Sequence, residues 1–428
     1  MAAALAALRA SDAALRRAAV ASCWLPATSA CAKSMSSGKV PEHIMQMART
    51  PQTGISLKQL MEFGATVKQG GSMREETLIQ AAKFLHHELP VRFAHRISEL
   101  HNLPHGLAAM PSVQRVASWY GVYERSLEDL IQTRAPVTEQ ELKTFGRLLS
   151  DIYQRHGPTL VTMARGIVEF RKSLKLASPE MLPANIERDT FDFLDTFYLS
   201  RIGIRTLIGQ HLALQEDTPG FVGMIQSDMK PVQVIQGAVD DAAFMCHRTF
   251  GEAPDVGIYT RDEDFGFPYI PSHLHHIIFE LMKNSMRAVI EQHSESLAGV
   301  LPPIKVIVAQ GDSNEDIVIK VSDEGGGIPR SGMRRIWSYF YTTYEVQGER
   351  DAGGGGASSA LAHDDAGDFT TDTPMAGLGY GLPLSRLFTR YFGGDLTIIS
   401  MEGYGTDAYV HLRRVGDAAE PITNSKFV

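Results

Sequence analysis

Two patterns of apolar and polar residues divide this chain into a helical half and a mixed half. From about residue 45 to residue 216 the apolar positions recur with helical spacing, and strand-like alternation is almost missing. Thr138 and Glu141 have the spacing of a capping box, which starts a helix, and Phe191–His211 is a second long periodic run. Prolines are expected to punctuate the stretch at Pro90, Pro104, Pro111, Pro136 and Pro158. This half is predicted to be an antiparallel bundle of four principal helices.

After position 220, short alternating runs that are typical of strands appear between helical stretches. Two hairpins are predicted, one from Ile304–Gln310 and Asp316–Ser322 and one from Asp395–Met401 and Thr406–Arg413. A long helix from about Ser272 to Gln292 would pack on one face of the resulting mixed sheet. The predicted fold class is therefore α+β, a helical bundle followed by an α/β sandwich.

A polar stripe lies on the predicted helix Ser272–Gln292. Its members are spaced by three or four residues on one helical face: His276, Glu280, Asn284 and Arg287. The remaining positions are mostly apolar, so most of the helix should be buried. A buried carboxylate is costly unless something polar occupies the site. Alone, such a stripe is typical of a solvated face, but the sequence that follows favours a ligand site.

Two glycine clusters come after this helix. The first, VSDEGGGIP at 321–329, follows a strand pattern, and the second, AGLGYGLPLSR at 376–386, runs into a predicted helix. Glycines let backbone N–H groups approach an anion closely, and a helix N-terminus adds a favourable dipole. The second cluster lacks the βαβ unit and acidic partner of a dinucleotide fingerprint.

In this order, the stripe and the two clusters resemble the ATP-binding domain shared by histidine kinases, type II topoisomerases, certain heat-shock chaperones and mismatch-repair ATPases. Longer segments, over about residues 45 to 415, resemble the mitochondrial pyruvate dehydrogenase kinases. In the second half these segments are ELMKNSMRA at 280–288, SDEGGGIPR at 322–330, YTT at 341–343, MAGLGYGLPLSRLFTRYFGGDL at 375–396 and SMEGYGTDAYVHL at 400–412. In the helical half they include GISLKQLMEFG at 54–64, FLHHELPVRFAHR at 84–96 and FYLSRIGIRTLIGQH at 197–211. The short C-terminal end looks closer to plant or algal members than to animal members.

The resemblance and the chemistry of the residues together assign roles in the site. Glu280 would accept the proton of the attacking hydroxyl, and His276, one turn earlier, would tune its basicity. Asn284 would offer a neutral oxygen to Mg²⁺, and Asp323 would accept the adenine amine. The expected ATP-binding set is Glu280, Lys283, Asn284, Arg287, Asp323, Gly325, Gly327, Thr342, Thr343, Gly377, Leu378, Gly379, Tyr380, Gly381, Leu382 and Thr406. Lys283 and Arg287 would either contact phosphates or only cap the helix face.

A second site is implied in the helical half. His156, Arg201 and Arg205 match positions at which the family binds small α-keto acids, and arginine forks suit a carboxylate. Tyr123 and Tyr153 stand where a small and a basic residue are expected in animal members. A salt bridge within the bundle is the alternative role for both arginines.

The resemblance implies a protein-serine kinase. It would transfer the γ-phosphoryl group of ATP to the α subunit of the pyruvate dehydrogenase decarboxylase component, inactivate the complex and so regulate acetyl-CoA production. It also implies Mg²⁺, a homodimer, and the lipoyl domain of dihydrolipoyl acetyltransferase as a partner. The HRD and VAIK motifs of eukaryotic-type kinases are missing, so this interpretation depends on the resemblance.

Two alternative functions remain. Branched-chain 2-oxo acid dehydrogenase kinases share the ATP-site motifs. FLHHELPVR at 84–92 superficially looks like the phosphoacceptor box of a self-phosphorylating histidine kinase, with His86 or His87 as the acceptor. An ATP-gated clamp, such as a chaperone or topoisomerase, would need a large transducer domain after the ATP site and is not favoured.

Composition narrows the location and the partners. The formal net charge of −8, without a basic cluster, argues against nucleic acid, and no apolar run is long enough to span a bilayer. Cys23, Cys31 and Cys246 have neither metal nor disulfide spacing, which favours a reducing compartment. The first 40 residues are rich in alanine and serine and contain one acid, Asp12, against five arginines and lysines, as in a mitochondrial transit peptide, so the matrix is the expected location. A disordered basic extension and a chloroplast address are the alternatives.

The expected organisation has four parts. These are a transit peptide at 1–40, a regulatory helical bundle at 41–216, a histidine-kinase-like ATP-binding domain at 217–416 and a tail at 417–428. Within the third part, residues 347–374 contain almost no large apolar residue and are expected to be a disordered insertion in the ATP lid.

Overall fold

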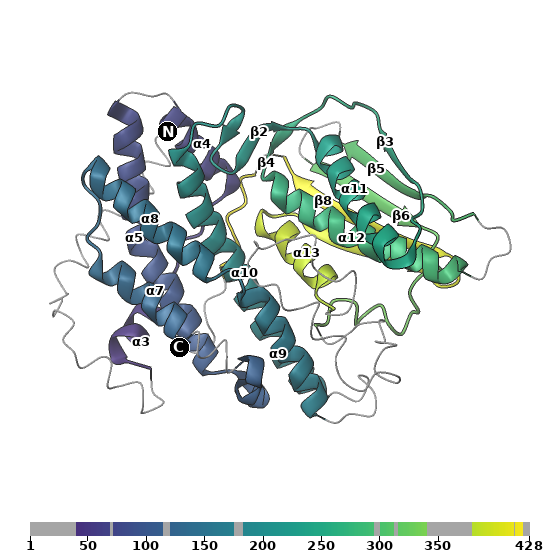
Figure 1. Cartoon of the computed structure of the whole chain (residues 1–428), viewed down its shortest axis with the longest axis horizontal. Coiled ribbons are helices and arrows are strands. Elements are labelled where there is room, and N and C mark those ends of the chain that lie inside the picture. Colours follow the sequence, from purple (N-terminus) through teal and green to yellow (C-terminus); the bar gives the residue numbers. More distant parts are fainter. Residues whose placement is uncertain are drawn as a thin grey trace.

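Helices make up the first half of the chain (Figure 1). The computed structural model describes residues 40–68, 72–113, 120–174, 183–294, 300–311, 316–339, 379–414 and 416–422. The predicted lid insertion, and all but the last residue of the predicted transit peptide, lie outside these ranges. The helices are α3 (Glu42–Ala48), α4 (Leu57–Lys68), α5 (Ser72–His101), the 3₁₀ helix η2 (Pro104–Ala109), α7 (Tyr120–Gln132), α8 (Glu139–Arg155), α9 (Thr159–Ser173) and α10 (Ala184–Gln215).

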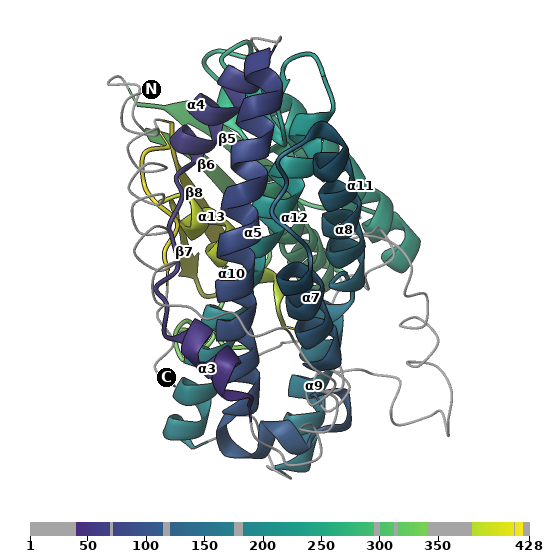
Figure 2. The same ribbon diagram turned by 90° about the vertical axis from the view of Figure 1, so that its left-hand side faces the viewer.

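Helix α5 is the centre of the helical half, because α7, α8 and α10 all pack against it (Figure 2). Helix α8 starts at the predicted capping box. The Thr138 hydroxyl accepts the Glu141 N–H over 3.3 Å, and the Glu141 carboxylate accepts the Thr138 N–H over 3.1 Å. The buried face of α8 carries Leu142, Phe145, Leu149 and Ile152, as its apolar spacing predicted. The helical pattern of this half is confirmed.

Pro90 does not punctuate the chain, and that prediction was wrong. It lies inside α5, whereas Pro104 and Pro158 stand at the starts of η2 and α9. Proline removes one helical hydrogen bond and crowds the preceding turn. Every residue from 88 to 100 is buried, so the tertiary packing of this segment outweighs the local loss.

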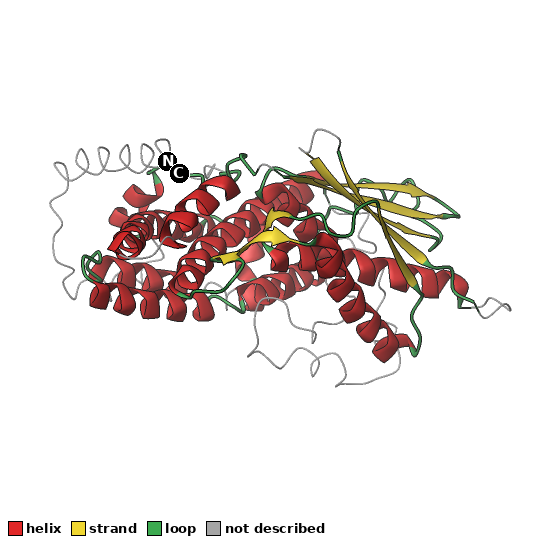
Figure 3. Cartoon of the chain, turned by 90° about the horizontal axis from the view of Figure 1, so that it is seen from above, coloured by secondary structure: helices red, strands yellow, loops and turns green. Residues whose placement is uncertain are grey.

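The second half is a five-stranded sheet with helices on one side (Figures 1 and 3). Its elements are β1 (Phe221–Val222), β2 (Ile225–Met229), α11 (Pro231–Phe250), β3 (Val256–Thr260), β4 (Phe267–Tyr269), α12 (Pro271–His293), β5 (Ile304–Gln310), β6 (Asp316–Asp323), α13 (Gly381–Tyr391), β7 (Asp395–Met401) and β8 (Gly405–Arg413). The strand order is β3-β5-β6-β8-β7, and only the β3–β5 pair is parallel. Strands β1, β2 and β4 form a separate small sheet. Both predicted hairpins are confirmed: β5 and β7 have the predicted bounds, and β6 and β8 are each one residue longer.

The two faces of the large sheet differ because side chains alternate along each strand. On β5, Ile304, Val306 and Val308 are buried, while Ile307 is 40% exposed on the opposite face. Its neighbour in register, Tyr259 of β3, is 55% exposed. Helices α11, α12 and α13 cover the first face, and among the residues that the structure describes Figure 3 shows no helix over the second.

After β8 the chain returns to the helical half. Ala419 forms an isolated antiparallel bridge with Ser56, and the Glu420 N–H donates to the Ile55 carbonyl over 3.1 Å. The Lys58 N–H donates to the Gly416 carbonyl over 2.9 Å. Residues 416–422, the C-terminal strap, therefore run beside residues 54–58 at the start of α4.

A buried ion cluster fastens the C-terminal strap. The Arg92 Nε atom on α5 lies 2.9 Å from Glu88 Oε1, and Arg92 Nη2 lies 2.5 Å from Glu420 Oε1. Arg92 Nη2 also donates to the Thr53 carbonyl, and the Tyr391 hydroxyl of α13 donates to Glu420 Oε2 over 2.8 Å. Burial lowers the pKa of the Arg92 guanidinium, but the charges of Glu420 and Glu88 outweigh burial and raise that pKa above its ordinary value. This cluster joins the helical half to α13.

Glu420→Gln should reduce the free energy of unfolding by roughly 3 kcal/mol, because removing one charge of a buried pair leaves its partner poorly compensated. Chemical denaturation monitored by circular dichroism measures the change. The matched control is Glu139→Gln, which removes an exposed helical pair with Lys143 (2.7 Å) and should leave stability unchanged within error. Equal stability of the two variants would show that the charge of Glu420 contributes nothing to the stability of the fold.

Candidate active site

The predicted base, Glu280, lies where α12 meets the first turn of α13. Its Oε1 atom is 2.8 Å from Lys283 Nζ, one turn further along α12. Its Oε2 atom faces Gly381, because a Cβ built on that glycine would lie only 2.4 Å away. Glu280 therefore comes together with Lys283 and with the glycine cluster at the N-terminus of α13, as the sequence predicted.

The other stripe residues have different surroundings. His276 is buried, and its ring lies 5.0 Å from that of Phe388 on α13. Asn284 is exposed, one turn after Glu280. The Arg287 Nε atom donates to Glu291 Oε1 over 2.6 Å on the same helix, which is the helix-face role left open by the sequence. The tuning contact between His276 and Glu280 stays a prediction.

Asp323 ties three elements together at the end of β6. One carboxylate oxygen accepts the Ser285 hydroxyl of α12 over 2.7 Å. The other accepts the N–H groups of Gly325 (3.0 Å) and Thr406 (3.2 Å). Burial raises the pKa of the Asp323 carboxyl, and these hydrogen bonds oppose that rise. A carboxylate has about four acceptor positions, so one is left for a further donor such as an adenine amine.

Two glycines of the first cluster are needed for different reasons. Gly325 lies against α12, because a Cβ at this position would be only 2.5 Å from the Cβ of Ala288. Gly327 has a φ of +71°, and a Cβ there would lie 2.2 Å from the Met401 carbonyl oxygen. Both the backbone conformation and the space therefore require glycine at 327. Thr406 lies near the start of β8, and its hydroxyl oxygen is 3.0 Å from the hydroxyl oxygen of Ser400 on β7.

The second cluster is attached to the helical half through aromatic rings. Tyr380, which precedes α13, packs with Tyr339 (5.0 Å between ring centroids) and with Tyr198 of α10 (5.8 Å). The Tyr339 hydroxyl donates to Asp195 Oδ1 of α10 over 2.7 Å. Burial has a larger effect on the pKa of Asp195 than this hydrogen bond, which opposes it, and the pKa is raised to about 6. The tyrosine cluster was not predicted; only Tyr380 was singled out, by its place between glycines.

Within the second cluster, Gly379 has a φ of +73°, and Leu382 lies in the first turn of α13, partly buried against the core. The remaining predicted nucleotide residues, Thr342, Thr343, Gly377 and Leu378, lie outside the described residues.

The three residues of the predicted keto-acid site meet at the C-terminal end of α8. Arg201 donates to the carbonyls of His156 (3.2 Å) and Gly157 (2.9 Å), and Arg205 donates to that of Tyr153 (3.0 Å). The Arg205 guanidinium also lies 3.6 Å from the centre of the Tyr153 ring. Burial, followed by the charges of nearby arginines, lowers the pKa of His156 to about 3, so its ring is neutral.

Tyr123 fills space beside this group. Its ring meets that of His156 edge-on at 4.3 Å, and the His156 Nε2 atom lies 3.0 Å from the Ser126 hydroxyl. The bulky residue noted in the sequence therefore packs directly on the predicted site.

The two histidines of the alternative phosphoacceptor box lie on α5. His86 Nε2 is 2.6 Å from the Thr133 carbonyl oxygen, to which it donates, and His87 is exposed. The contact gives His86 a packing role between α5 and the end of α7.

A DFG tripeptide, which in eukaryotic-type kinases holds a metal, occurs at Asp264–Gly266. It lies between β3 and β4. Phe265 is buried and its ring stacks on that of Phe267 at 6.4 Å, while the Asp264 carbonyl accepts from Lys230. The tripeptide is part of the packing around the small sheet.

The chain is similar to proteins of known families. Residues 54–226 match the family described as mitochondrial branched-chain alpha-ketoacid dehydrogenase kinase, and residues 269–416 match the histidine kinase-, DNA gyrase B-, and HSP90-like ATPase family. A pyruvate dehydrogenase (acetyl-transferring) kinase of Arabidopsis thaliana is 44% identical over 373 residues, which cover 87% of this chain and 93% of the relative.

The chain belongs to the pyruvate dehydrogenase (acetyl-transferring) kinase family. A Schizosaccharomyces pombe member is 37% identical and covers 89% of this chain and 98% of its own length. Isozyme 4 of Homo sapiens is 35% identical, and the matched residues cover 88% of this chain and 85% of the relative. Family membership confirms the prediction that the protein is a protein kinase that uses ATP. The identity to the Arabidopsis member is higher than that to the fungal and human members, which agrees with the plant or algal resemblance of the sequence.

Gly381→Ala should reduce kcat by about tenfold to 100-fold, because the new Cβ would push Glu280 Oε2 away from its position and small misplacements of reacting groups are costly. Steady-state kinetics with circular dichroism as a folding check test this. The matched control is Gly237→Ala on α11, where a Cβ meets nothing closer than 4.0 Å. Wild-type kcat in Gly381→Ala would mean that the position of Glu280 Oε2 does not matter to the reaction.

Proposed function

We propose that the protein transfers the γ-phosphoryl group of ATP to a serine on the α subunit of the pyruvate dehydrogenase decarboxylase component and thereby inactivates the complex. The choice of substrate is supported by the names of the curated relatives, which cover most of this chain. The observation that carries the chemistry is the Glu280 carboxylate, which is held between Lys283 and the N-terminus of α13.

In this proposal Glu280 accepts the proton of the serine hydroxyl as its oxygen bonds to the γ-phosphorus and the bond to the ADP oxygen breaks. A general base of this kind contributes about 10²–10⁴ in rate. Backbone N–H groups at the start of α13 face the phosphates, where the helix dipole favours negative charge. Asp323 accepts the adenine amine at the other side of the site.

Asn284 would hold Mg²⁺ beside the phosphates. Its exposed amide, one turn after Glu280, is a neutral oxygen donor at the edge of the site. Among the described residues no group of three or more His, Cys, Asp or Glu side chains converges as a metal site. A single protein oxygen fits Mg²⁺, which usually keeps several waters and binds through one or two protein groups plus substrate phosphates. When bound, the ion neutralises charge on the transferred group.

Incubation of the protein with ATP, Mg²⁺ and either the pyruvate or the branched-chain decarboxylase should give phosphoserine on the pyruvate enzyme, mapped by mass spectrometry. Glu280→Gln should keep ATP affinity, measured by calorimetry, yet lose about 10²–10⁴ in single-turnover rate. An equal loss of affinity would make Glu280 a nucleotide ligand instead of the base.

The same experiment decides between the alternatives. The N-terminal family match is described by a branched-chain kinase, so preferential labelling of the branched-chain enzyme would support that second function. Acid-labile label on the kinase itself, lost when His86 and His87 are replaced by alanine, would support a histidine kinase.

An apolar pocket in the helical half supports the proposed lipoyl-domain partner. It has a cavity volume of about 160 Å³ and is lined by Thr53, Gly54, Ile55, Gln59, Leu60, Phe63, Ala81, Phe84, Leu85, Leu207, Gln210, His211 and Leu214. Such a lining suits an extended, weakly polar group such as a lipoyl chain.

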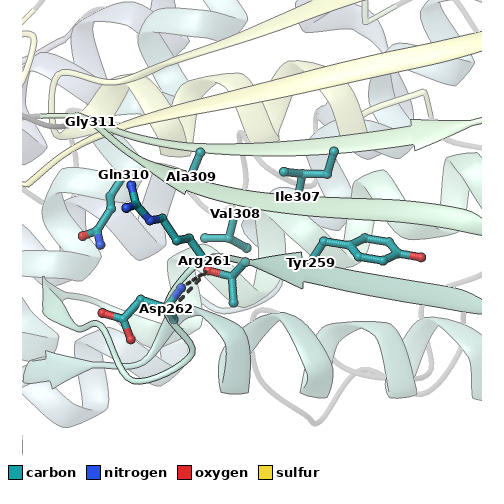
Figure 4. Close-up of a pocket in the computed structure, with 9 residues that line it drawn as sticks. Tyr259, Arg261, Asp262, Ile307, Val308, Ala309, Gln310 and Gly311 are labelled. Carbon is teal, nitrogen blue, oxygen red and sulfur yellow. Dashed lines mark hydrogen bonds between the residues drawn. The ribbon is translucent and has the colours of Figure 1, made fainter.

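The open sheet face supports the proposed homodimer. Figure 4 shows a hollow over β3 and β5, where Tyr259 and Ile307 project from neighbouring strands. Ile399 and Met401 of β7 are also exposed at 58% and 67%. Exposed apolar side chains on one side of a sheet mark an interaction surface, and a second copy of the same face would cover them.

Ile307→Lys should therefore yield a monomer where the parent is a dimer, as measured by light scattering after gel filtration. Phe244→Lys is the matched control, since Phe244 is 60% exposed on α11, on the helical side of the sheet. Loss of the dimer only in the control would move the interface to the helices.

The named relatives are mitochondrial, which supports a mitochondrial location, and we place the protein in the matrix with its substrate complex. No helix in the described ranges is long and apolar enough to cross a membrane.

A further inference from the structure

Lys283 carries a charge in a place where lysine is seldom found. Only 4% of the residue is exposed, although it lies on a helix that borders the candidate site. Lysine is almost never this deeply buried unless its ammonium group is paired. The sequence left two roles open, a phosphate contact and a cap on the helix face, and both require an ammonium group that reaches solvent or ligand.

The partners of the ammonium group point to another role. Lys283 Nζ is 2.8 Å from Glu280 Oε1 and 4.9 Å from the centre of the Phe279 ring. Both partners belong to the preceding turn of α12, so the regular helix sets their spacing. The ring face adds a favourable interaction with the cation.

The two oxygens of Glu280 are therefore in different environments. Oε1 is engaged by Lys283, while Oε2 faces Gly381 at the start of α13. We propose that Lys283 is a positioning residue, which holds Oε1 so that Oε2 is presented to the substrate hydroxyl at the phosphate end of the site. The proposal rests on the proposed function, because it presumes that Glu280 is the base.

The test compares Lys283→Met with Lys283→Arg. Lys283→Met keeps an unbranched side chain without the charge and should lower kcat by about tenfold to 100-fold, as expected for a misplaced reacting group. Its ATP affinity by calorimetry should change by less than about threefold, since no phosphate contact is lost. Lys283→Arg should recover part of kcat, because its guanidinium can still bind the carboxylate.

The matched control is Lys143→Met on α8, which removes a similar helical lysine–glutamate pair that is exposed. It should leave kcat and ATP affinity unchanged. In the Glu280→Gln background, Lys283→Met should have little further effect on kcat, because there is no longer a base to position.

Three results would overturn the proposal. A loss of ATP affinity as large as the loss of kcat in Lys283→Met would make Lys283 a phosphate ligand. Wild-type kcat in that variant would show that no positioning is needed. If Lys283→Met lowered kcat as much in the Glu280→Gln background as in the wild type, Lys283 would act independently of Glu280. Failure of the proposed function appears differently: the wild-type protein would not phosphorylate a decarboxylase, or Glu280→Gln would keep full activity.

Discussion

The buried Arg92 guanidinium is the interaction on which the relation between the two halves depends. It contacts Glu88 on its own helix, the Thr53 carbonyl before α4 and Glu420 from the C-terminal strap. Each of these groups would be costly to bury alone, and their contacts with one another offset that cost. Their mutual requirement explains why α5 continues through Pro90, since Glu88 and Arg92 stand on either side of that proline, one turn apart.

Helix α13 is fastened at both of its ends to parts of the helical half. At its N-terminus Tyr380 packs on Tyr198 of α10, and at its C-terminus Tyr391 donates to Glu420 in the ion cluster. The helix that presents Gly381 to the candidate base therefore has little freedom to shift or rotate. A site assembled from α12 and α13 needs this restraint, because transfer depends on reacting groups being held in place before the substrate arrives.

Local patterns predicted the fold well and the site in part. The hairpins follow from alternation, the start of α8 from Thr138 and Glu141, and the meeting of Glu280 with Gly381 from the family resemblance of two motifs. The resemblance could not reveal that Lys283 is buried or that Arg287 pairs with Glu291, because spacing on a helix does not say which face the rest of the protein covers. Arg92 and Glu420 were missed altogether. Nothing near either residue indicates its partner, since their pairing is set by the whole path of the chain.

That path has a consequence for the order of folding. Ile55 and Glu420, joined by a hydrogen bond of 3.3 Å, are 365 positions apart, and Arg92 is 328 positions from the same carboxylate. Contacts between distant parts of a chain form slowly, because a long loop must close before they stabilise anything. On the ribosome the helical half emerges first, with Arg92 still open to water on the Glu420 side. The helical half is thus synthesised first but completed last, because Arg92 gains its Glu420 partner only after the second half of the chain has been made.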